Sequence, residues 1–266
     1  MSAGKLPAPR RPALHSATIL TLACLSLSLL AWSGRPEAAS CAGTTEGGGS
    51  TESSATTQSP LPLQMARVGS AEQLIVATGA KLGDTAGTLQ FFDYQNGEWV
   101  CTMTVSARFG KHGLTDGAHR QAGNKTTPTG LWSMPNFVFG YRAHSLAGTR
   151  MKYRRITKKS WWSSKRGTTY NTWVEAKRWP GEHLYNVAPQ YELAVSTGYN
   201  AKPNTSVYGR GSGIFLHVKG KGLTAGCVAI SRADMIRVCG LLDPAKHPAF
   251  AIGTLRRDSK TSIWAY

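Results

Sequence analysis

Acidic side chains are scarce in this chain of 266 residues. Only 14 Asp and Glu stand against 31 Lys and Arg, which gives a formal net charge of +17. This excess of positive charge favours anionic surroundings. Cysteine is also scarce, with five residues, and no Cys or His lies at zinc-like spacing from another. We therefore expect no metal centre, because a structural or catalytic zinc needs at least three protein ligands.

The first 40 residues have the pattern of an export signal. Basic residues precede the apolar run 19–32, and small residues follow at 38–40. This pattern predicts a signal peptide or an uncleaved membrane anchor over residues 1–40. Lipid attachment at Cys41 stays open as a third outcome. We expect an exported protein of the cell envelope, periplasmic or otherwise extracytoplasmic, and export argues against nucleic acid as the anionic partner.

Residues 41–61 consist mainly of Gly, Ser and Thr with almost nothing to bury. Such a composition cannot offset the entropy of ordering, so it predicts a flexible linker. The remaining residues, 62–266, amount to one domain of ordinary size. Their sequence does not decide the oligomeric state.

Short β-rich runs dominate this domain. Gln73 to Ala80 predicts a strand, and the runs 89–95 and 98–105 are joined by Asn96-Gly97, the preferred sequence of a type I′ hairpin turn. After residue 230, Ser231 has Asp234 three positions later, which predicts a capped helix over residues 232–242. A last strand is expected over residues 249–255. The sum predicts a mainly β sandwich or barrel with one principal helix.

Residues 211–231 deliver the strongest chemical signal. The apolar run 214–218 carries His217, and the run 224–230 carries Cys227 directly after Gly226. A hairpin would bring the two runs together, so that the imidazole could take the thiol proton and activate a nucleophile. The Gly226 and Cys227 N–H groups would then form an oxyanion hole. The competing interpretation is a satisfied core histidine and a small buried cysteine.

Two motifs favour the catalytic interpretation. F-L-H-V (215–218) followed by T-A-G-C-V (224–228) resembles the signature of the L,D-transpeptidase (YkuD-type) family, and T-P-T-G (127–130) resembles an element upstream of it beside the active-site face. Ala225 and Ala229 stand where many members have His and Arg. Arg210 and Arg232 are the nearest candidates for the missing arginine, and together with Thr224 they are the expected substrate-binding residues.

The resemblance implies an enzyme that acts on peptidoglycan stem peptides without a cofactor. The Cys227 thiolate would attack the carbonyl of the third stem residue, expel the terminal D-Ala and form a thioester, which an acceptor amine would resolve into a cross-link. His217 would act as general base and acid, oriented by a backbone carbonyl near Val218. Two alternatives stay open: an L,D-carboxypeptidase with the same site, and a non-catalytic basic protein that binds the cell envelope.

The segment 142–178 holds eleven basic residues and one acid, interleaved with aromatics. In the family it resembles, such an insertion would form a lid or flank over the substrate groove and contact anionic cell-wall polymers or lipid headgroups. The competing interpretation is a solvated basic loop whose aromatics are partly core.

Cys101 and Cys239 are both expected to face the interior, Cys101 from the second strand of the hairpin and Cys239 from the helix. In an oxidising compartment they form a pair, or they are two buried thiols. The sequence leaves this choice open.

Overall fold

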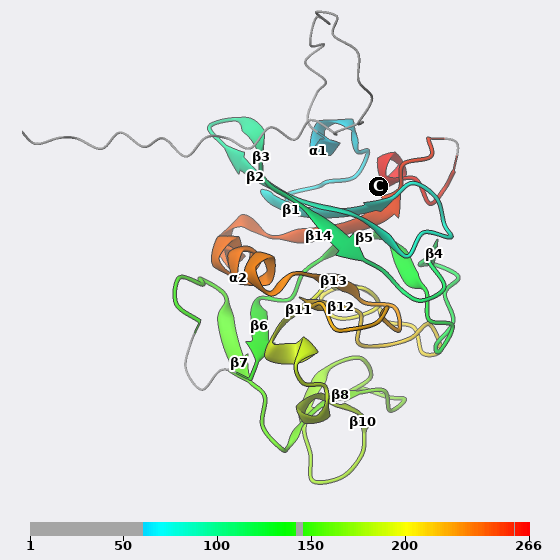
Figure 1. Ribbon diagram of the computed structural model, residues 1–266, viewed down its shortest axis with the longest axis vertical. Coiled ribbons are helices and arrows are strands. Elements are labelled where there is room, and N and C mark those ends of the chain that lie inside the picture. Colours follow the sequence, from blue (N-terminus) through cyan, green and yellow to red (C-terminus); the bar gives the residue numbers. More distant parts are fainter. Residues whose placement is uncertain (1–60, 142–145, 258) are drawn as a thin grey trace, which may run out of the picture. The chain divides into compact units, whose positions relative to one another are not determined.

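The computed structural model describes residues 61–141, 146–257 and 259–266. Within them, eleven strands form one sheet and three form a second, smaller sheet (Figure 1). In spatial order the large sheet consists of β4 (Leu114–Asp116), β5 (Thr127–Ser133), β14 (Ala249–Thr254), β1 (Gln73–Gly79), β2 (Ala86–Gln95), β3 (Glu98–Arg108), β13 (Val228–Ile230), β12 (Phe215–Val218), β11 (Leu193–Ser196), β6 (Phe137–Gly140) and β7 (Lys152–Arg155). The small sheet is β10 (Gly181–His183), β8 (Ser160–Ser163) and β9 (Trp173–Glu175).

Helices are few among the described residues. The α-helices are α1 (Leu61–Gln64) and α2 (Arg232–Leu241), and short 3-10 turns cover Leu184–Asn186, Gln190–Glu192, Pro244–Lys246 and Ile263–Ala265. The expected mainly β fold with one principal helix after Cys227 is confirmed. The expected signal peptide or anchor and, up to residue 60, the expected linker lie outside the described residues. No helix within the described ranges is both long and apolar enough to cross a membrane.

The predicted hairpin is present as β2 and β3. Asn96 and Gly97 both have positive φ, +52° and +88°, as a type I′ turn requires. The register shifts between Phe91 and Phe92, so that Phe91 lies opposite Met103 and Phe92 opposite Cys101. This bulge turns the two ends of β3 toward different apolar clusters.

The large sheet bends so that its two halves pack across one core. Side chains from β1, β2 and β3 share this core with side chains from β6, β11, β12 and β13. The halves are joined where Ala229 of β13 pairs with Arg108 of β3. Layers that face each other across a shared apolar core are the arrangement of a sandwich.

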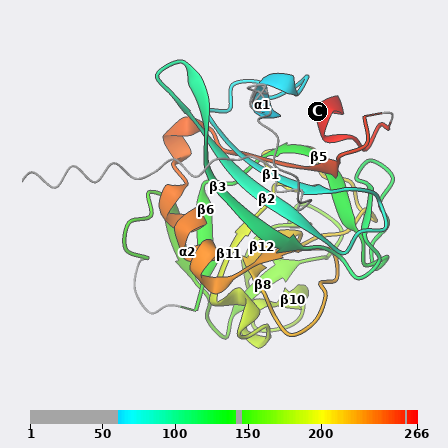
Figure 2. The same cartoon turned by 45° about the horizontal axis from the view of Figure 1, so that its top comes forward.

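Helix α2 closes one side of this core (Figure 2). Ser231 caps it by accepting a hydrogen bond from the Asp234 N–H, as predicted. Met235, Val238 and Cys239 are fully buried on its inner face. The helix therefore holds the end of β13, and with it the segment that carries Cys227.

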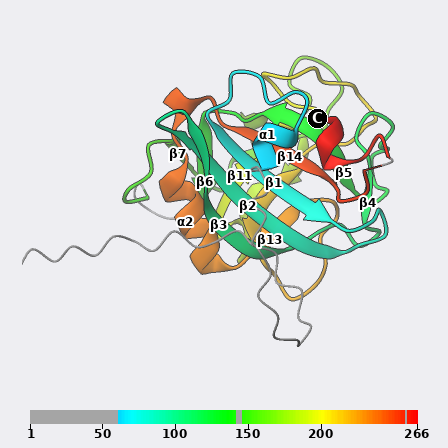
Figure 3. The ribbon, with the colours of Figure 1, turned by 90° about the horizontal axis from the view of Figure 1, so that it is seen from above.

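The outer face of β1 and β14 carries a second apolar cluster. Helix α1 and the C-terminal residues lie together over it (Figure 3), where Met65 and Ile263 pack against Leu74 and Val76. Both faces of this half of the sheet are therefore covered.

Cys101 and Cys239 do not form the disulfide that was one of the two expectations. Cys101 takes part in a disulfide, whereas Cys239 is a buried thiol. A Cys101–Cys239 bridge is therefore wrong, and so is the alternative in which both residues are buried thiols. The reason lies in the bulge of β3, which places Cys101 in the outer cluster while Cys239 lies in the central core.

Candidate active site

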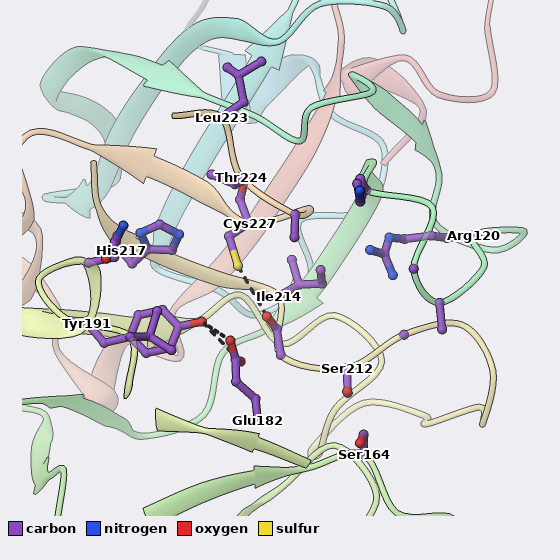
Figure 4. A pocket seen from close by; sticks show the side chains of 18 of the residues that line it. Arg120, Ser164, Glu182, Tyr191, Ser212, Ile214, His217, Leu223, Thr224 and Cys227 are labelled. Carbon is purple, nitrogen blue, oxygen red and sulfur yellow. Dashed lines mark hydrogen bonds between the residues drawn. The ribbon is translucent and has the colours of Figure 1, made fainter. Parts of the chain in front are cut away.

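A cleft of about 830 Å³ contains both Cys227 and His217. Figure 4 shows the Cys227 sulfur between the His217 ring on one side and the Arg120 guanidinium on the other, with Glu182 beneath. Loops around β12 supply much of the lining, and the segment 164–182 supplies the opposite wall. The structure thus brings the two predicted reactive side chains into one cavity.

The backbone does not form the expected hairpin. Strands β12 and β13 pair in parallel, with His217 beside Ala229 and Leu216 beside Val228. Only residues 228–230 of the second run are strand, and Cys227 lies just before it. Parallel strands need a crossover, because a tight turn reverses the chain direction, and here residues 219–227 provide it. Cys227 and His217 still share one face. His217 pairs with Ala229, and Cys227 is two residues before Ala229, so the alternation of side chains along a strand puts both on the same side.

The Cys227 thiol is held by backbone groups in its resting state. Its sulfur donates to the Gly213 carbonyl oxygen at 3.3 Å and accepts from the Phe215 N–H at 3.4 Å. Burial raises the pKa of the thiol to about 12, a rise that the Phe215 N–H and the Arg120 charge only partly offset. The resting nucleophile is therefore a neutral thiol.

The His217 ring has a defined proton arrangement. Its Nδ1 lies 2.8 Å from the Val218 carbonyl oxygen. A carbonyl only accepts, so Nδ1 carries the proton and Nε2 is the basic nitrogen. Burial lowers the pKa of the imidazole, which keeps the ring neutral. The predicted orienting carbonyl near Val218 is present.

Two threonines fix the turn that carries the nucleophile. Thr224 Oγ1 donates to the Cys227 carbonyl oxygen at 2.7 Å and accepts from the Gly226 N–H at 3.1 Å. Thr127, the first residue of the T-P-T-G element, is fully buried and donates to the same carbonyl at 3.4 Å. Thr224 thus shapes the turn, although it also lines the cleft. The Gly226 N–H is already engaged, so of the two donors expected at the oxyanion hole the Cys227 N–H is the one left.

Gly226 has little space for a side chain. Its φ is +137°, and a Cβ there would lie 2.8 Å from Arg120 Nη2 and from the Thr126 carbonyl oxygen. Only glycine adopts this conformation without strain. The absent side chain lets the Arg120 guanidinium approach the turn.

Arg120 is the functional candidate that the sequence did not reveal. Its side chain is 4% exposed, its Nε donates to the Thr126 carbonyl at 2.9 Å, and its Nη1 donates to the Arg210 carbonyl at 2.9 Å. It lies in a loop between β4 and β5, about one hundred residues before Cys227. In sequence it has no signal that separates it from any surface arginine.

The arginines expected to contact substrate lie elsewhere. Arg232 is exposed on α2 and pairs with Glu192, its Nε 2.6 Å from a carboxylate oxygen. Arg210 contributes its carbonyl to Arg120, but its side chain lies along a different pocket. Neither lines the cleft with Cys227. Nearness in sequence was a poor guide here: Gly209 and Gly211 on either side of Arg210 line the cleft although the Arg210 side chain does not, and Arg232 is held by Glu192.

Glu182 and Tyr191 also line the cleft and were not singled out from the sequence. The Tyr191 hydroxyl donates to both Glu182 carboxylate oxygens, at 3.2 and 3.3 Å. Solvent reaches Glu182 through the cleft, yet the surrounding protein removes enough hydration to raise the pKa of the carboxyl. Burial and the nearby carboxylate raise the pKa of Tyr191 well above its ordinary value, so its hydroxyl stays a donor.

The described part of the basic segment, residues 146–178, shows features of both interpretations, whereas residues 142–145 with Arg142 lie outside the described residues. Trp162 is buried and packs edge-on against Phe215, with ring centroids 4.7 Å apart. Tyr170 and Ser164 line the cleft, so the segment forms one flank of it. Its Lys and Arg side chains lie largely in solvent, at positions 152, 155, 158, 159, 165, 166, 177 and 178.

No group of three or more His, Cys, Asp or Glu side chains within the described ranges is arranged to hold a metal ion. The groups of the cleft with nucleophilic or acid–base chemistry are the Cys227 thiol and the His217 imidazole, with Arg120 and Glu182 beside them.

The sequence matches the family of L,D-transpeptidase catalytic domains (YkuD) over residues 82–250. This match covers well over half of the chain, and the chain therefore belongs to that family. Among curated proteins, none matches it. The matched range includes both strands of the cleft, the T-P-T-G element and the basic flank.

Proposed function

We propose that this protein is an exported L,D-transpeptidase that acylates Cys227 with a peptidoglycan stem peptide and transfers the stem to an acceptor amine. The observation that carries the proposal is the shared cleft of Cys227 and His217, with the basic Nε2 of the imidazole fixed by the Val218 carbonyl. Family membership supports the same chemistry.

The roles follow from the resting geometry. His217 Nε2 takes the Cys227 proton as the sulfur attacks the stem carbonyl, and then returns it to the leaving amine of D-Ala. Since both partners are neutral at rest, proton transfer accompanies the attack. A preformed ion pair is not needed.

The tetrahedral oxyanion is stabilised by the Cys227 N–H and by Arg120. Gly226 exposes this side of the turn, and Arg120 Nη2 lies against it. In this chain Arg120 takes the role of the arginine that Ala229 replaces. Ala229 is buried in the sheet beside His217, so an arginine at position 229 would have to bury its guanidinium there. A donor at an oxyanion hole contributes about 10²-fold to 10³-fold in rate.

Export is part of the proposal. The N-terminal pattern of a basic region, an apolar run and small residues supports it. The segment that lines one side of the cleft also carries exposed Lys and Arg side chains, and anionic wall polymers or lipid headgroups bound to them would hold the enzyme near its substrate.

Product analysis tests the proposal. A tetrapeptide stem is incubated with the full chain, with and without an acceptor amine, and the products are separated by mass. Release of D-Ala with formation of the cross-linked stem identifies a transpeptidase. Release of D-Ala alone in both mixtures identifies an L,D-carboxypeptidase. If Cys227→Ala leaves envelope binding intact and the wild type releases no D-Ala, the protein is a non-catalytic envelope-binding protein.

A further inference from the structure

Glu182 has no cationic side chain paired with it among the described residues. In the part of the chain that the structure describes, no Lys or Arg forms an ion pair with it, and its hydrogen bonds come from the Tyr191 hydroxyl. Other carboxylates of this basic chain are paired with cations: Asp93, Asp116, Glu192 and Asp243. A carboxylate accepts about four hydrogen bonds, so Glu182 keeps capacity for a ligand.

The position of Glu182 is close to the reacting sulfur. Its Oε2 lies 3.3 Å from where a Cβ on Gly213 would be, and the carbonyl of Gly213 accepts the Cys227 S–H. Figure 4 shows Glu182 and Arg120 at different sides of the sulfur. The cleft therefore presents a negative and a positive group around one nucleophile.

Tyr191 holds the carboxylate in place. It is buried, with its ring edge-on to Phe215 at 5.5 Å and to His217 at 5.6 Å between centroids. Glu182 itself lies on β10, which pairs with Trp162 of β8. Rigid neighbours on both sides fix the direction of the carboxylate, as a binding group requires.

We propose that the Glu182 carboxylate, oriented by Tyr191, is a binding site for a primary ammonium group of a stem peptide beside the thioester on Cys227. This rests on the proposed function. A primary ammonium is the fitting ligand because it is a compact positive charge with three N–H donors. The two oxygens of the Glu182 carboxylate supply the opposite charge and accept from those donors. The ammonium belongs either to the side chain of the donor's third residue or to the acceptor.

The reaction balances with an acceptor bound there. The ammonium loses one proton to solvent through the Glu182 carboxylate, and the resulting amine attacks the thioester carbonyl carbon. A C–N bond forms and the C–S bond breaks, with its electron pair returning to Cys227 Sγ. The second proton of the amine passes through His217 Nε2 to the sulfur, which leaves an amide and a neutral thiol.

The experiment separates the two half-reactions with Glu182→Gln. Acylation rates are measured with a tetrapeptide donor whose third residue has a free side-chain amine, and with the same donor after N-acetylation. Aminolysis of the acyl-enzyme is measured with a diamino acid and with methoxyamine, which is uncharged near neutral pH. Glu98→Gln, an exposed change of the same charge at the hairpin tip, is the matched control.

We expect the selectivity for the cationic compound to fall about tenfold in Glu182→Gln, in the donor arm or the acceptor arm, since charged hydrogen bonds contribute at least that much. The arm affected identifies which ammonium binds. Glu182→Asp restores part of the selectivity, and Glu98→Gln retains all of it. Unchanged selectivity in both arms overturns the subsite alone. Absence of any wild-type acyl-enzyme overturns the proposed function and the subsite with it.

Discussion

The pH at which Cys227 loses its proton follows directly from its surroundings. Burial raises the pKa of this thiol to about 12, against an ordinary value of about 9. The difference corresponds to about 4 kcal/mol of preference for the neutral thiol. Burial also lowers the pKa of His217, so the imidazole does not compensate by holding a proton. At pH 8, only about one thiol in ten thousand is ionised in the resting enzyme.

Alkylation by iodoacetamide measures this ionisation, because the thiolate is the nucleophile. We expect the rate at Cys227 to keep rising with pH beyond pH 10, without levelling between pH 6 and pH 8. Mass mapping separates Cys227 from the buried Cys239, and the variant Cys227→Ala gives the background. A rate that levels near pH 7 would show a preformed thiolate and imidazolium pair, and would refute the neutral resting state.

Three substitutions test other parts of the account. Gly226→Ala places a Cβ 2.8 Å from the Arg120 guanidinium at a strained φ. Urea unfolding should therefore show a free energy of unfolding lower by about 1–3 kcal/mol, and acylation should be lost. A variant as stable as the wild type would contradict this. Arg120→Gln should slow acylation about 10²-fold, whereas the exposed Arg155→Gln should not, and equal rates would exclude an oxyanion role. Ser231→Ala removes the cap of α2 and should cost about 1 kcal/mol in urea unfolding, and no change in midpoint would count against it.

Local chemistry was predictable from the sequence where a short stretch decides the outcome. The Asn96-Gly97 turn forms because few sequences adopt two consecutive positive φ values without strain. Ser231 caps its helix for a similarly local reason. The His217 and Cys227 pair was predictable because both lie in one motif.

Contacts between distant segments could not be predicted in the same way. The parallel pairing of β12 and β13 depends on a crossover that the apolar runs do not specify, and the expected hairpin was the simpler connection. Arg120 and Glu182 reach the cleft from other parts of the chain, so no spacing relates them to Cys227. Arg232, which is near Cys227 in sequence, binds Glu192 instead.

The acyl-enzyme tests the central claim most directly. The full chain is incubated with a tetrapeptide stem or with a carbapenem, and the mass of the intact protein is measured for the wild type, Cys227→Ala and His217→Ala. We predict an adduct of one acyl group per chain in the wild type, none in Cys227→Ala, and slower formation in His217→Ala. No adduct in the wild type with either compound, or an adduct that survives in Cys227→Ala, would contradict the assignment of Cys227 as the nucleophile.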